Sequence, residues 1–280
     1  MLSKSQLADR MKGIGGSDVG IILGLSTYKT PYELYLEKKG LLIPAQKMTP
    51  QQEWGHRLEP IIREKFQENN DVKIIEPETT IHPFYEFMRA NVDGFIPSTN
   101  MVFEAKSSGA FMAKDWGDDG SDIIPMSYLT QVAHYVSVFN ADGANIALLL
   151  GGNDYREFIY KRDYTLEQTI IDACNTFWGW VQNNIEPNPI NIDDLKLKYA
   201  KEDVTKLITA NAELELLIPS FADIKRQQKE LKVMETEHKY KIMEYMKDAT
   251  CLIDCNGEPL VTLKATKKGN RTLLLKGSKS

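Results

Sequence analysis

The sequence predicts an α/β (α+β) fold in which a central mixed sheet is flanked by helices. Its 280 residues are 42% apolar and 26% charged, a balance typical of a globular chain with a sizeable core. Helical and β-like patterns follow one another in the order α, β-meander, α, β, β, α, which favours such a sheet. Pro187-Asn-Pro189 then separates this part from a charged, helical one. We therefore expect two domains, 1–190 and 191–280.

The first expected helix is short. Ser17 or Asp18 can cap it, because both side chains accept hydrogen bonds from the first free N–H groups of a helix. The helix would run through Leu23, and Gly24 can end it because glycine readily adopts the left-handed conformation.

Two further helices are expected before the sheet. Thr30-Pro-Tyr-Glu33 is a capping box with proline at the first helical position, so a helix should run to about Lys39 and stop at Gly40. Apolar residues then repeat at helical spacing from Gln52 to Glu68. Pro60 interrupts this pattern, so that helix either begins near Glu59 or bends there.

The β-like segments of the first domain are short and are separated by turn residues. The first four are expected at residues 72–75, 79–82, 88–92 and 101–106. A helix from Ser127 to Phe139 follows, then a hairpin of residues 144–150 and 156–160, and a helix from Thr165 through Trp180. In the second domain we expect helix from Asp193 to about Asp248 and a small β-hairpin within residues 252–263.

Composition limits the classes of function only loosely. No stretch approaches the length of about 20 apolar residues that a membrane span requires, and the first residues lack the apolar core of a signal peptide, so we expect a cytoplasmic protein. The net charge of −5 argues weakly against nucleic-acid binding. Charge is segregated, however: from Val261 onward the chain has no acid but carries Lys264, Lys267, Lys268, Arg271, Lys276 and Lys279. This basic end either contacts DNA or is a solvated tail.

The informative segment for chemistry runs from Asp93 to Lys106. Side chains alternate along a strand, so Glu104 and Lys106 should share one face, and a hairpin can bring Asp93 beside them. Two carboxylates, with water and the backbone carbonyl of Ala105, suit Mg²⁺, which prefers oxygen ligands. Such a metal would act as a Lewis acid and activate a water, while Lys106 would orient or deprotonate that water or stabilise charge on the reacting phosphate.

An ordinary acid–lysine bridge on an exposed strand pair would give the same spacing, and such bridges are common. Two flanking features favour a site. Glu59 lies on an upstream helix and could reach the same metal, although an acid in the first turn of a helix is also favoured by the helix dipole. Gln131 and Tyr135 lie four residues apart on the downstream helix and hence on one face.

The order Glu59, Asp93, Glu104-Ala-Lys106, Gln131-x₃-Tyr135 resembles the PD-(D/E)XK nuclease superfamily, with Val92 in place of the proline. More narrowly, Gly13-Ile-Gly-Gly-Ser-Asp18 together with Tyr28-Lys-Thr-Pro-Tyr-Glu-Leu34 resembles the YqaJ-like viral recombinases, relatives of lambda exonuclease. The similarity covers about residues 5–185. It implies a restriction-endonuclease-like core and a 5′→3′ exonuclease of phage or prophage origin that resects linear duplex DNA and leaves 3′ single strands.

The resemblance also implies roles for individual residues. Asp93 and Glu104 would be metal ligands, Lys106 the catalytic lysine, Glu59 an auxiliary ligand, and Gln131 a group that positions the water or Lys106. The site would hold two Mg²⁺ ions, with Mn²⁺ as a substitute. Tyr135 would support this arrangement, and Arg10 and Ser17 match family positions that hold the 5′ phosphate, which an arginine fork and a hydroxyl suit chemically. A single-strand-annealing protein and a homo-oligomeric ring, a trimer in relatives, are the expected partners.

Three alternatives remain at this point. A PD-(D/E)XK endonuclease would lack the 5′-phosphate pocket of Arg10 and Ser17. A DNA-binding module that does not cut would keep the fold, but the intact Asp93, Glu104 and Lys106 argue against it. The helices of residues 193–248 could also form an interaction module, which is compatible with catalysis in the first domain.

Overall fold

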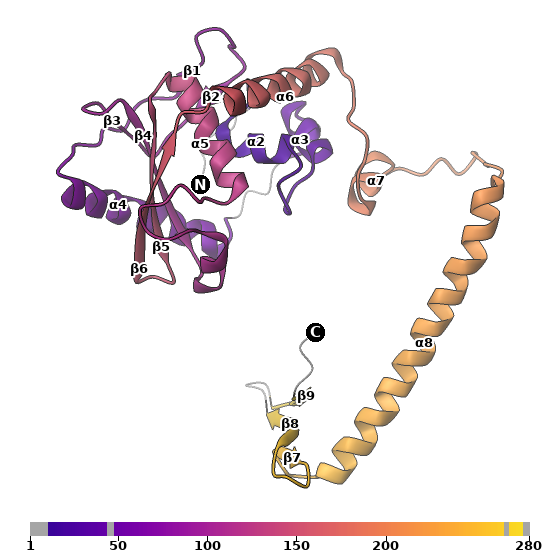
Figure 1. The fold of residues 1–280 in the computed structure, drawn as a ribbon. Coiled ribbons are helices and arrows are strands. Elements are labelled where there is room, and N and C mark those ends of the chain that lie inside the picture. The colour runs from indigo at the N-terminus through magenta and orange to yellow at the C-terminus, as the bar shows by residue number, and fades with distance from the viewer. Residues whose placement is uncertain (1–10, 44–47, 266–268, 277–280) are drawn as a thin grey trace. The chain divides into compact units, whose positions relative to one another are not determined.

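The computed structural model describes residues 11–43, 48–265 and 269–276, and Figure 1 shows its elements. Contacts divide the chain into two compact units, Met1–Glu202 and Asp203–Ser280, which are considered separately below. The boundary expected after residue 190 remains a prediction about independent folding. By contacts, residues 191–202 belong with the first unit.

A four-stranded mixed sheet forms the centre of the first unit, with strand order β3-β4-β5-β6 (Figure 1). The strands are β3 (Gly94–Ile96), β4 (Met101–Ser108), β5 (Gly143–Leu150) and β6 (Asp154–Lys161). β4 and β5 run parallel, whereas the two outer pairs are antiparallel hairpins. The predicted mixed sheet and the β5–β6 hairpin are thus confirmed.

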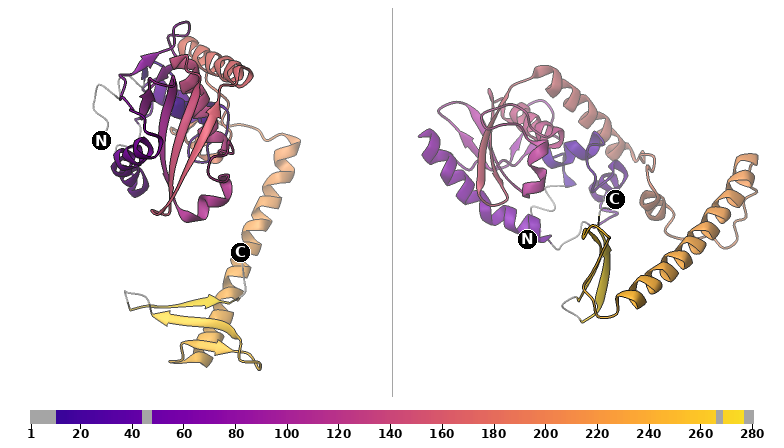
Figure 2. Two further views of the ribbon diagram at one scale, coloured as in Figure 1. Left: turned by 60° about the vertical axis from the view of Figure 1, so that its left-hand side comes forward. Right: turned by 60° about the horizontal axis from the view of Figure 1, so that its bottom comes forward.

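Helices cover both faces of this sheet (Figure 2). α4 (Pro50–Asn70) packs Ile62 and Phe66 against Phe103 on one face, with 5.0 Å between the Phe66 and Phe103 ring centroids. α5 (Met126–Phe139) packs the other face through a larger apolar cluster that includes Val132 and Val102. Because side chains alternate along β4, Glu104 and Lys106 share the α5 face with Val102.

The two short N-terminal helices test the capping predictions. α3 (Pro31–Lys38) has the predicted capping box: the Glu33 N–H donates to Thr30 Oγ1 over 3.0 Å, and the Thr30 N–H donates to Glu33 Oε2 over 2.9 Å. Gly40, at φ +68°, follows its end.

For α2 (Gly16–Ile22) the predicted cap was wrong, because Gly15 is the N-cap residue. Asp18 instead reaches back from the first turn, and its Oδ2 accepts the Gly15 N–H over 3.0 Å. Gly24, at φ +71°, lies just beyond the helix end, as predicted.

Pro60 does not begin α4. The helix starts at Pro50, with a Thr49–Gln52 capping box at its N-terminus, and continues through Pro60 on an exposed face. Packing of Ile62 and Phe66 against the sheet offsets the one backbone hydrogen bond that proline cannot make. Glu59 therefore lies in the middle of the helix, so the first-turn explanation for this acid was wrong.

The predicted β-meander is only partly formed. β1 (Thr80–Ile81) and β2 (Arg89–Ala90) pair as a separate two-stranded sheet, and residues 72–75 contribute a single bridge between Ile75 and Phe95 rather than a strand. The Gly13 segment runs parallel to the residues just before β2, and a bridge joins Ile14 to Met88. This places the glycine-rich segment next to β2.

The first unit ends with α6 (Tyr164–Asn183) and α7 (Ile192–Lys198). The fully buried Asp194 of α7 accepts a hydrogen bond of 2.7 Å from Thr30 Oγ1 and another of 2.9 Å from the Ile190 N–H. These bonds tie α7 to the N-terminal cap of α3.

The second unit consists of α8 (Ala212–Met246) and a three-stranded antiparallel sheet of β7 (Cys251–Ile253), β8 (Pro259–Ala265) and β9 (Arg271–Leu275). The predicted hairpin corresponds to β7 and β8, while β9 was not expected. The predicted helical region is interrupted between α7 and α8. Met246, Val261 and Leu263 form the small core of this unit.

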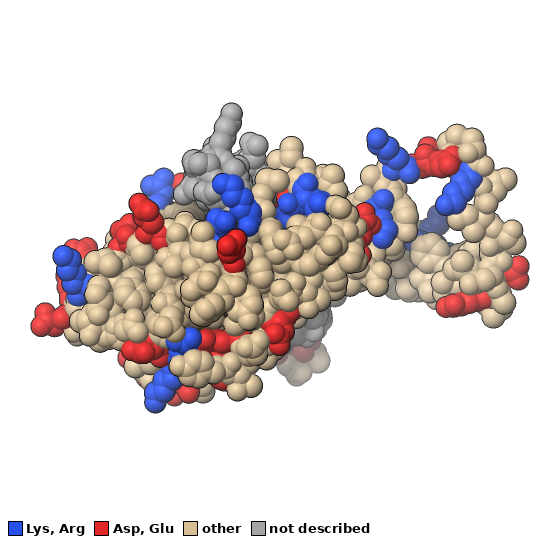
Figure 3. Space-filling view, turned by 90° about the horizontal axis from the view of Figure 1, so that it is seen from above, with Lys and Arg blue, Asp and Glu red and all other residues tan. Residues whose placement is uncertain are grey.

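The space-filling view in Figure 3 shows one face of the molecule. Acidic and basic side chains are interspersed on the described part of this face, without a large patch of either sign. Among the described residues, no helix has the length and apolar character needed to cross a membrane.

Candidate active site

A cavity of about 980 Å³ opens between α2, α4, β4 and α5. Its lining contains all the described residues for which the sequence predicted a role: Ser17, Glu59, Asp93, Glu104, Ala105, Lys106, Gln131 and Tyr135. The fold thus brings together side chains that are far apart in the sequence. Arg10, the remaining predicted residue, lies outside the described residues.

The β3–β4 hairpin positions Asp93 beside β4. Asp93 precedes β3, and its Oδ2 accepts the Ala105 N–H over 2.9 Å. This bond fixes one carboxylate oxygen next to the strand that carries Glu104 and Lys106. The hairpin predicted to join Asp93 to this pair is present.

Glu104, Lys106 and Gln131 form a closed set of hydrogen bonds on the α5 face of the sheet. Lys106 Nζ donates to Glu104 Oε1 over 2.6 Å and to Gln131 Oε1 over 3.3 Å. Gln131 Nε2 donates to Glu104 Oε1 and to the Tyr135 hydroxyl, both over 2.9 Å. Lys106 Nζ also lies 5.0 Å from the centre of the Tyr128 ring. Gln131 and Tyr135 therefore hold the acid–lysine pair in place from α5.

This set is largely shielded from water, unlike an ordinary surface ion pair. Only 3% of Glu104 is exposed, and burial raises the pKa of its carboxyl to about 7, although Lys106 opposes the shift. Burial also raises the pKa of Asp93, against the opposing effect of Lys106. Taking carboxylates out of water is costly, so their proximity here needs a chemical explanation.

Glu59 reaches the cavity from the middle of α4. Its Oε1 accepts a hydrogen bond of 2.9 Å from Arg63 Nη2. Burial, followed by the charge of Asp93, raises the pKa of its carboxyl. Glu59 is thus electrostatically coupled to Asp93, but Arg63 occupies one of its oxygens.

The carboxylates of the cavity fit a hard divalent cation. Glu104 Oε2 is buried and has no hydrogen-bond partner in the described part of the chain, which is an unfavourable state for a carboxylate oxygen. Asp93 supplies a second carboxylate. In the described part of the chain no three acidic, histidine or cysteine side chains converge as a closed metal cage. An open set of two carboxylates suits Mg²⁺, which usually retains several waters.

The glycine-rich segment forms the wall nearest Tyr135. A Cβ added at Gly16 would lie 2.4 Å from Cε1 of the Tyr135 ring, and one added at Gly13 would lie 2.4 Å from the Phe87 carbonyl oxygen. These glycines allow α2 and its preceding turn to approach α5 and β2 closely. Ser17 is exposed and lines the same cavity, and its role as a phosphate-binding hydroxyl stays a prediction.

Sequence reasoning missed Arg89, which also lines the cavity. Its backbone carbonyl accepts a hydrogen bond from Nε2 of the fully buried His134, over 2.9 Å. Burial lowers the pKa of His134 to about 4, so the ring is neutral and donates from Nε2. The only sequence signal was that Arg89 stands four residues before Asp93 in a β-like run, which does not reveal the cavity it faces.

Solved structures share the fold of the first unit. The chain superimposes on the crystal structure of an alkaline exonuclease from Laribacter hongkongensis with a TM-score of 0.54 and 17% identity, covering 71% of this chain and 98% of that one. The same exonuclease in complex with dAMP gives a TM-score of 0.52 at 17% identity, with the same coverage. The fold of the first unit is therefore an exonuclease fold.

Sequence comparison identifies the family. Residues 6–142 match the YqaJ-like viral recombinase domain. The chain is 34% identical over 251 residues to the uncharacterized protein YqaJ of Bacillus subtilis (strain 168), covering 87% of this chain and 78% of that protein. The chain belongs to the YqaJ-like viral recombinase family, as the predicted resemblance implied.

Proposed function

We propose that this protein is a Mg²⁺-dependent exonuclease that digests linear double-stranded DNA from its 5′ ends. The observation that carries the proposal is the buried Glu104 carboxylate. Lys106 and Gln131 hold one of its oxygens, and the other has no hydrogen-bond partner among the residues that the structure describes. The exonuclease fold supports it, as does the family. The exonuclease that shares the fold has been crystallised with dAMP, a nucleotide.

Asp93 and Glu104 would hold the metal, with the Ala105 carbonyl and Glu59 as further ligands for one or two ions. Mg²⁺ bound there would act as a Lewis acid toward the scissile phosphate and lower the pKa of an attacking water. The ammonium of Lys106 stabilises the negative charge that develops on the phosphate oxygens. Gln131 keeps Lys106 and Glu104 in register, and Tyr135 holds the Gln131 amide.

The direction of digestion follows from the 5′-phosphate pocket proposed for Arg10 and Ser17. If both residues hold a terminal phosphate, the first internucleotide bond is presented to Asp93 and Glu104, and internal sites are excluded. The single strand left with a 3′ end is then a substrate for an annealing protein. Assembly into a ring, a trimer by resemblance, would keep the duplex enclosed between successive cuts.

The test is digestion of a linear duplex that carries a 5′ phosphate at one end and a 5′ hydroxyl at the other. Wild type and Lys106→Ala are compared with Mg²⁺, with Mn²⁺ and with EDTA. We expect stepwise loss of nucleotides from the phosphorylated strand, dependence on the metal, and no digestion by the variant.

Two results would contradict the proposal. Internal cuts in a closed circular duplex would indicate an endonuclease on the same core. No digestion with either metal, from protein shown to be folded, would indicate a DNA-binding module that does not cut. Loss of the preference for the phosphorylated end in Ser17→Ala and Arg10→Gln is the specific test of the pocket.

A further inference from the structure

Arg89 stands out because no described residue matches its charge. It lies on β2 and lines the catalytic cavity, and its buried Nε atom has no hydrogen-bond partner among the described residues. Within the described part of the chain, its guanidinium forms no ion pair with any carboxylate. A guanidinium in this state is partly desolvated and uncompensated, which costs free energy unless an anion arrives.

The other shielded cations that the structure describes in the first unit are neutralised. Lys106 pairs with Glu104 over 2.6 Å, and Lys38 pairs with Asp18 over 2.6 Å. Arg63 pairs with Glu59, and Arg162 with Glu167. Arg89 has no such carboxylate, and it lines the cavity that a substrate would enter. The ligand of the cavity is therefore the best source of the missing anion.

The fold also holds Arg89 rigidly at both backbone groups. Its N–H donates to the Ile14 carbonyl over 2.9 Å, and its carbonyl accepts the His134 hydrogen bond. Gly13 makes room for the side chain, because a Cβ at that position would lie 3.0 Å from both Cδ and Nε of Arg89. The backbone of Arg89 is therefore held in place, and its side chain lies close against Gly13, which reduces the entropy lost on binding an anion.

We infer that Arg89 binds an internucleotide phosphate of the DNA strand held in the cavity, a contact separate from the terminal-phosphate pocket of Arg10 and Ser17. The inference rests on the proposed function, because DNA is what brings phosphates into this cavity. A guanidinium matches two phosphate oxygens with two parallel N–H groups, which an ammonium cannot do. Asn91 and Asp93 follow Arg89 in the chain and line the same cavity, so this phosphate would lie along the path that leads to the metal ligands.

The experiment measures binding of the full-length protein to a 5′-phosphorylated duplex in EDTA, over a range of KCl concentrations. Arg89→Gln removes the charge, and Arg89→Lys keeps it without the fork. Lys161→Gln is the matched control, since Lys161 is the exposed last residue of edge strand β6 and does not line the cavity. Thermal unfolding verifies that each variant is folded.

We expect Arg89→Gln to weaken binding about tenfold and to reduce the slope of log K against log[KCl] by about 1, as for one lost phosphate contact. Arg89→Lys should retain the slope, and Lys161→Gln should match wild type. An unchanged slope in folded Arg89→Gln overturns the inference.

A second measurement locates the phosphate. Neutral methylphosphonate linkages are placed one at a time at the first positions from the 5′ end, and binding is measured in EDTA again. Wild type should lose affinity at each linkage whose phosphate the protein contacts. Arg89→Gln should be insensitive at one of these linkages and lose as much affinity as wild type at the others. Equal losses of affinity in both proteins at every linkage overturn the assignment. So does an Arg89→Gln variant whose weaker binding disappears only when the terminal phosphate is removed, because Arg89 would then contact that phosphate. Neither measurement requires cutting, so a protein that binds in this way but does not digest would refute the proposed function alone.

Discussion

Charged side chains in the two units of this protein have opposite environments. In the first unit, Glu104 and Asp18 are buried, Lys106 is largely shielded with 17% of its side chain exposed, and all three are held by specific contacts. On α8 the charges face water: Lys232 and Glu235 pair over 3.0 Å with 74% and 62% of their side chains exposed. The difference teaches that the number of ion pairs says little, because only burial makes a pair costly to break and chemically unusual.

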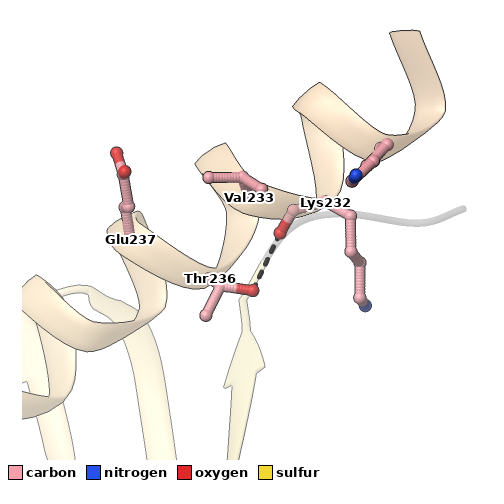
Figure 4. Close-up of a pocket in the computed structure, with 5 residues that line it drawn as sticks. Lys232, Val233, Thr236 and Glu237 are labelled. Atoms are coloured by element: carbon pink, nitrogen blue, oxygen red, sulfur yellow. Dashed lines mark hydrogen bonds between the residues drawn. The ribbon is translucent and has the colours of Figure 1, made fainter. Parts of the chain in front are cut away.

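A shallow depression on α8 illustrates the second environment (Figure 4). It is lined by Lys229, Lys232, Val233, Thr236 and Glu237, all from one helix. Its hydrogen bond runs from Thr236 Oγ1 to the Lys232 carbonyl over 2.8 Å, within the helix itself (Figure 4). Nothing in this depression resembles the convergence of elements around Glu104.

The largest expected difference between the two environments is in catalysis. Lys106→Met should lower the rate of duplex digestion by about 10²–10⁴-fold, as expected for a charged group that acts at the reacting centre. Lys232→Met should leave that rate unchanged. Initial rates on the same phosphorylated duplex measure both effects. Equal rates for Lys106→Met and wild type would show that the shielded Lys106 has no catalytic role.

The next effect concerns stability. Lys38→Met removes the cation that pairs with buried Asp18 and also donates to the Gly13 carbonyl over 2.7 Å. We expect a loss of about 3–5 kcal/mol in the free energy of unfolding, because Asp18 would keep a buried charge. Lys232→Met should change it little. Urea unfolding monitored by circular dichroism gives both values, and similar losses for the two variants would contradict the comparison.

Acid should destabilise the first unit through His134. Its pKa is about 4 in the folded protein and 6.5 in the unfolded chain, so the folded state binds fewer protons between these values. Stability from this group is complete above pH 6.5 and decreases as the pH falls toward 4, by about 3 kcal/mol in all. His134→Gln, which can still donate to Arg89, should flatten this dependence, whereas exposed His238→Gln should not. An acid-induced loss of equal size in His134→Gln would contradict the assignment.

The smallest effect is expected from removing the second unit. All residues that line the cavity in the described part of the chain fall between Gly13 and Tyr135. A chain truncated after Glu202 should therefore still digest duplex DNA stepwise, with a much smaller change in rate than Lys106→Met causes. Binding of the annealing protein, in contrast, should be lost if the α8 unit is an interaction module. Loss of digestion by folded, truncated protein would show that the two units share the catalytic work.

The features predicted correctly depend on neighbours in the sequence. The capping box of Thr30 and Glu33 is a local set of hydrogen bonds, and the common face of Glu104 and Lys106 follows from the alternation of a strand. The features missed depend on tertiary contacts. Pro60 is accepted in α4 because distant packing outweighs a local preference, and residues 72–75 bridge only at Ile75.

The candidate site shows the same division. Spacing identified Asp93, Glu104, Lys106 and the Gln131–Tyr135 face, all of which line one cavity. Spacing could not identify Arg89, because its unmatched charge depends on which described residues of other elements surround it, and none of these is an acid that pairs with it. Spacing also could not reveal that Arg63 donates a hydrogen bond to one carboxylate oxygen of Glu59, a contact that only the formed helix shows.

The close approach of Gly16 to Tyr135 has a consequence for how mutations would act. A single methyl group at position 16 would collide with the tyrosine ring, whose hydroxyl holds Gln131, which in turn holds Glu104. Gly16, which has no functional group, thus influences the orientation of the Glu104 carboxylate three contacts away. Genetic screens that score only loss of activity would class such a position as catalytic, although its contribution is purely steric.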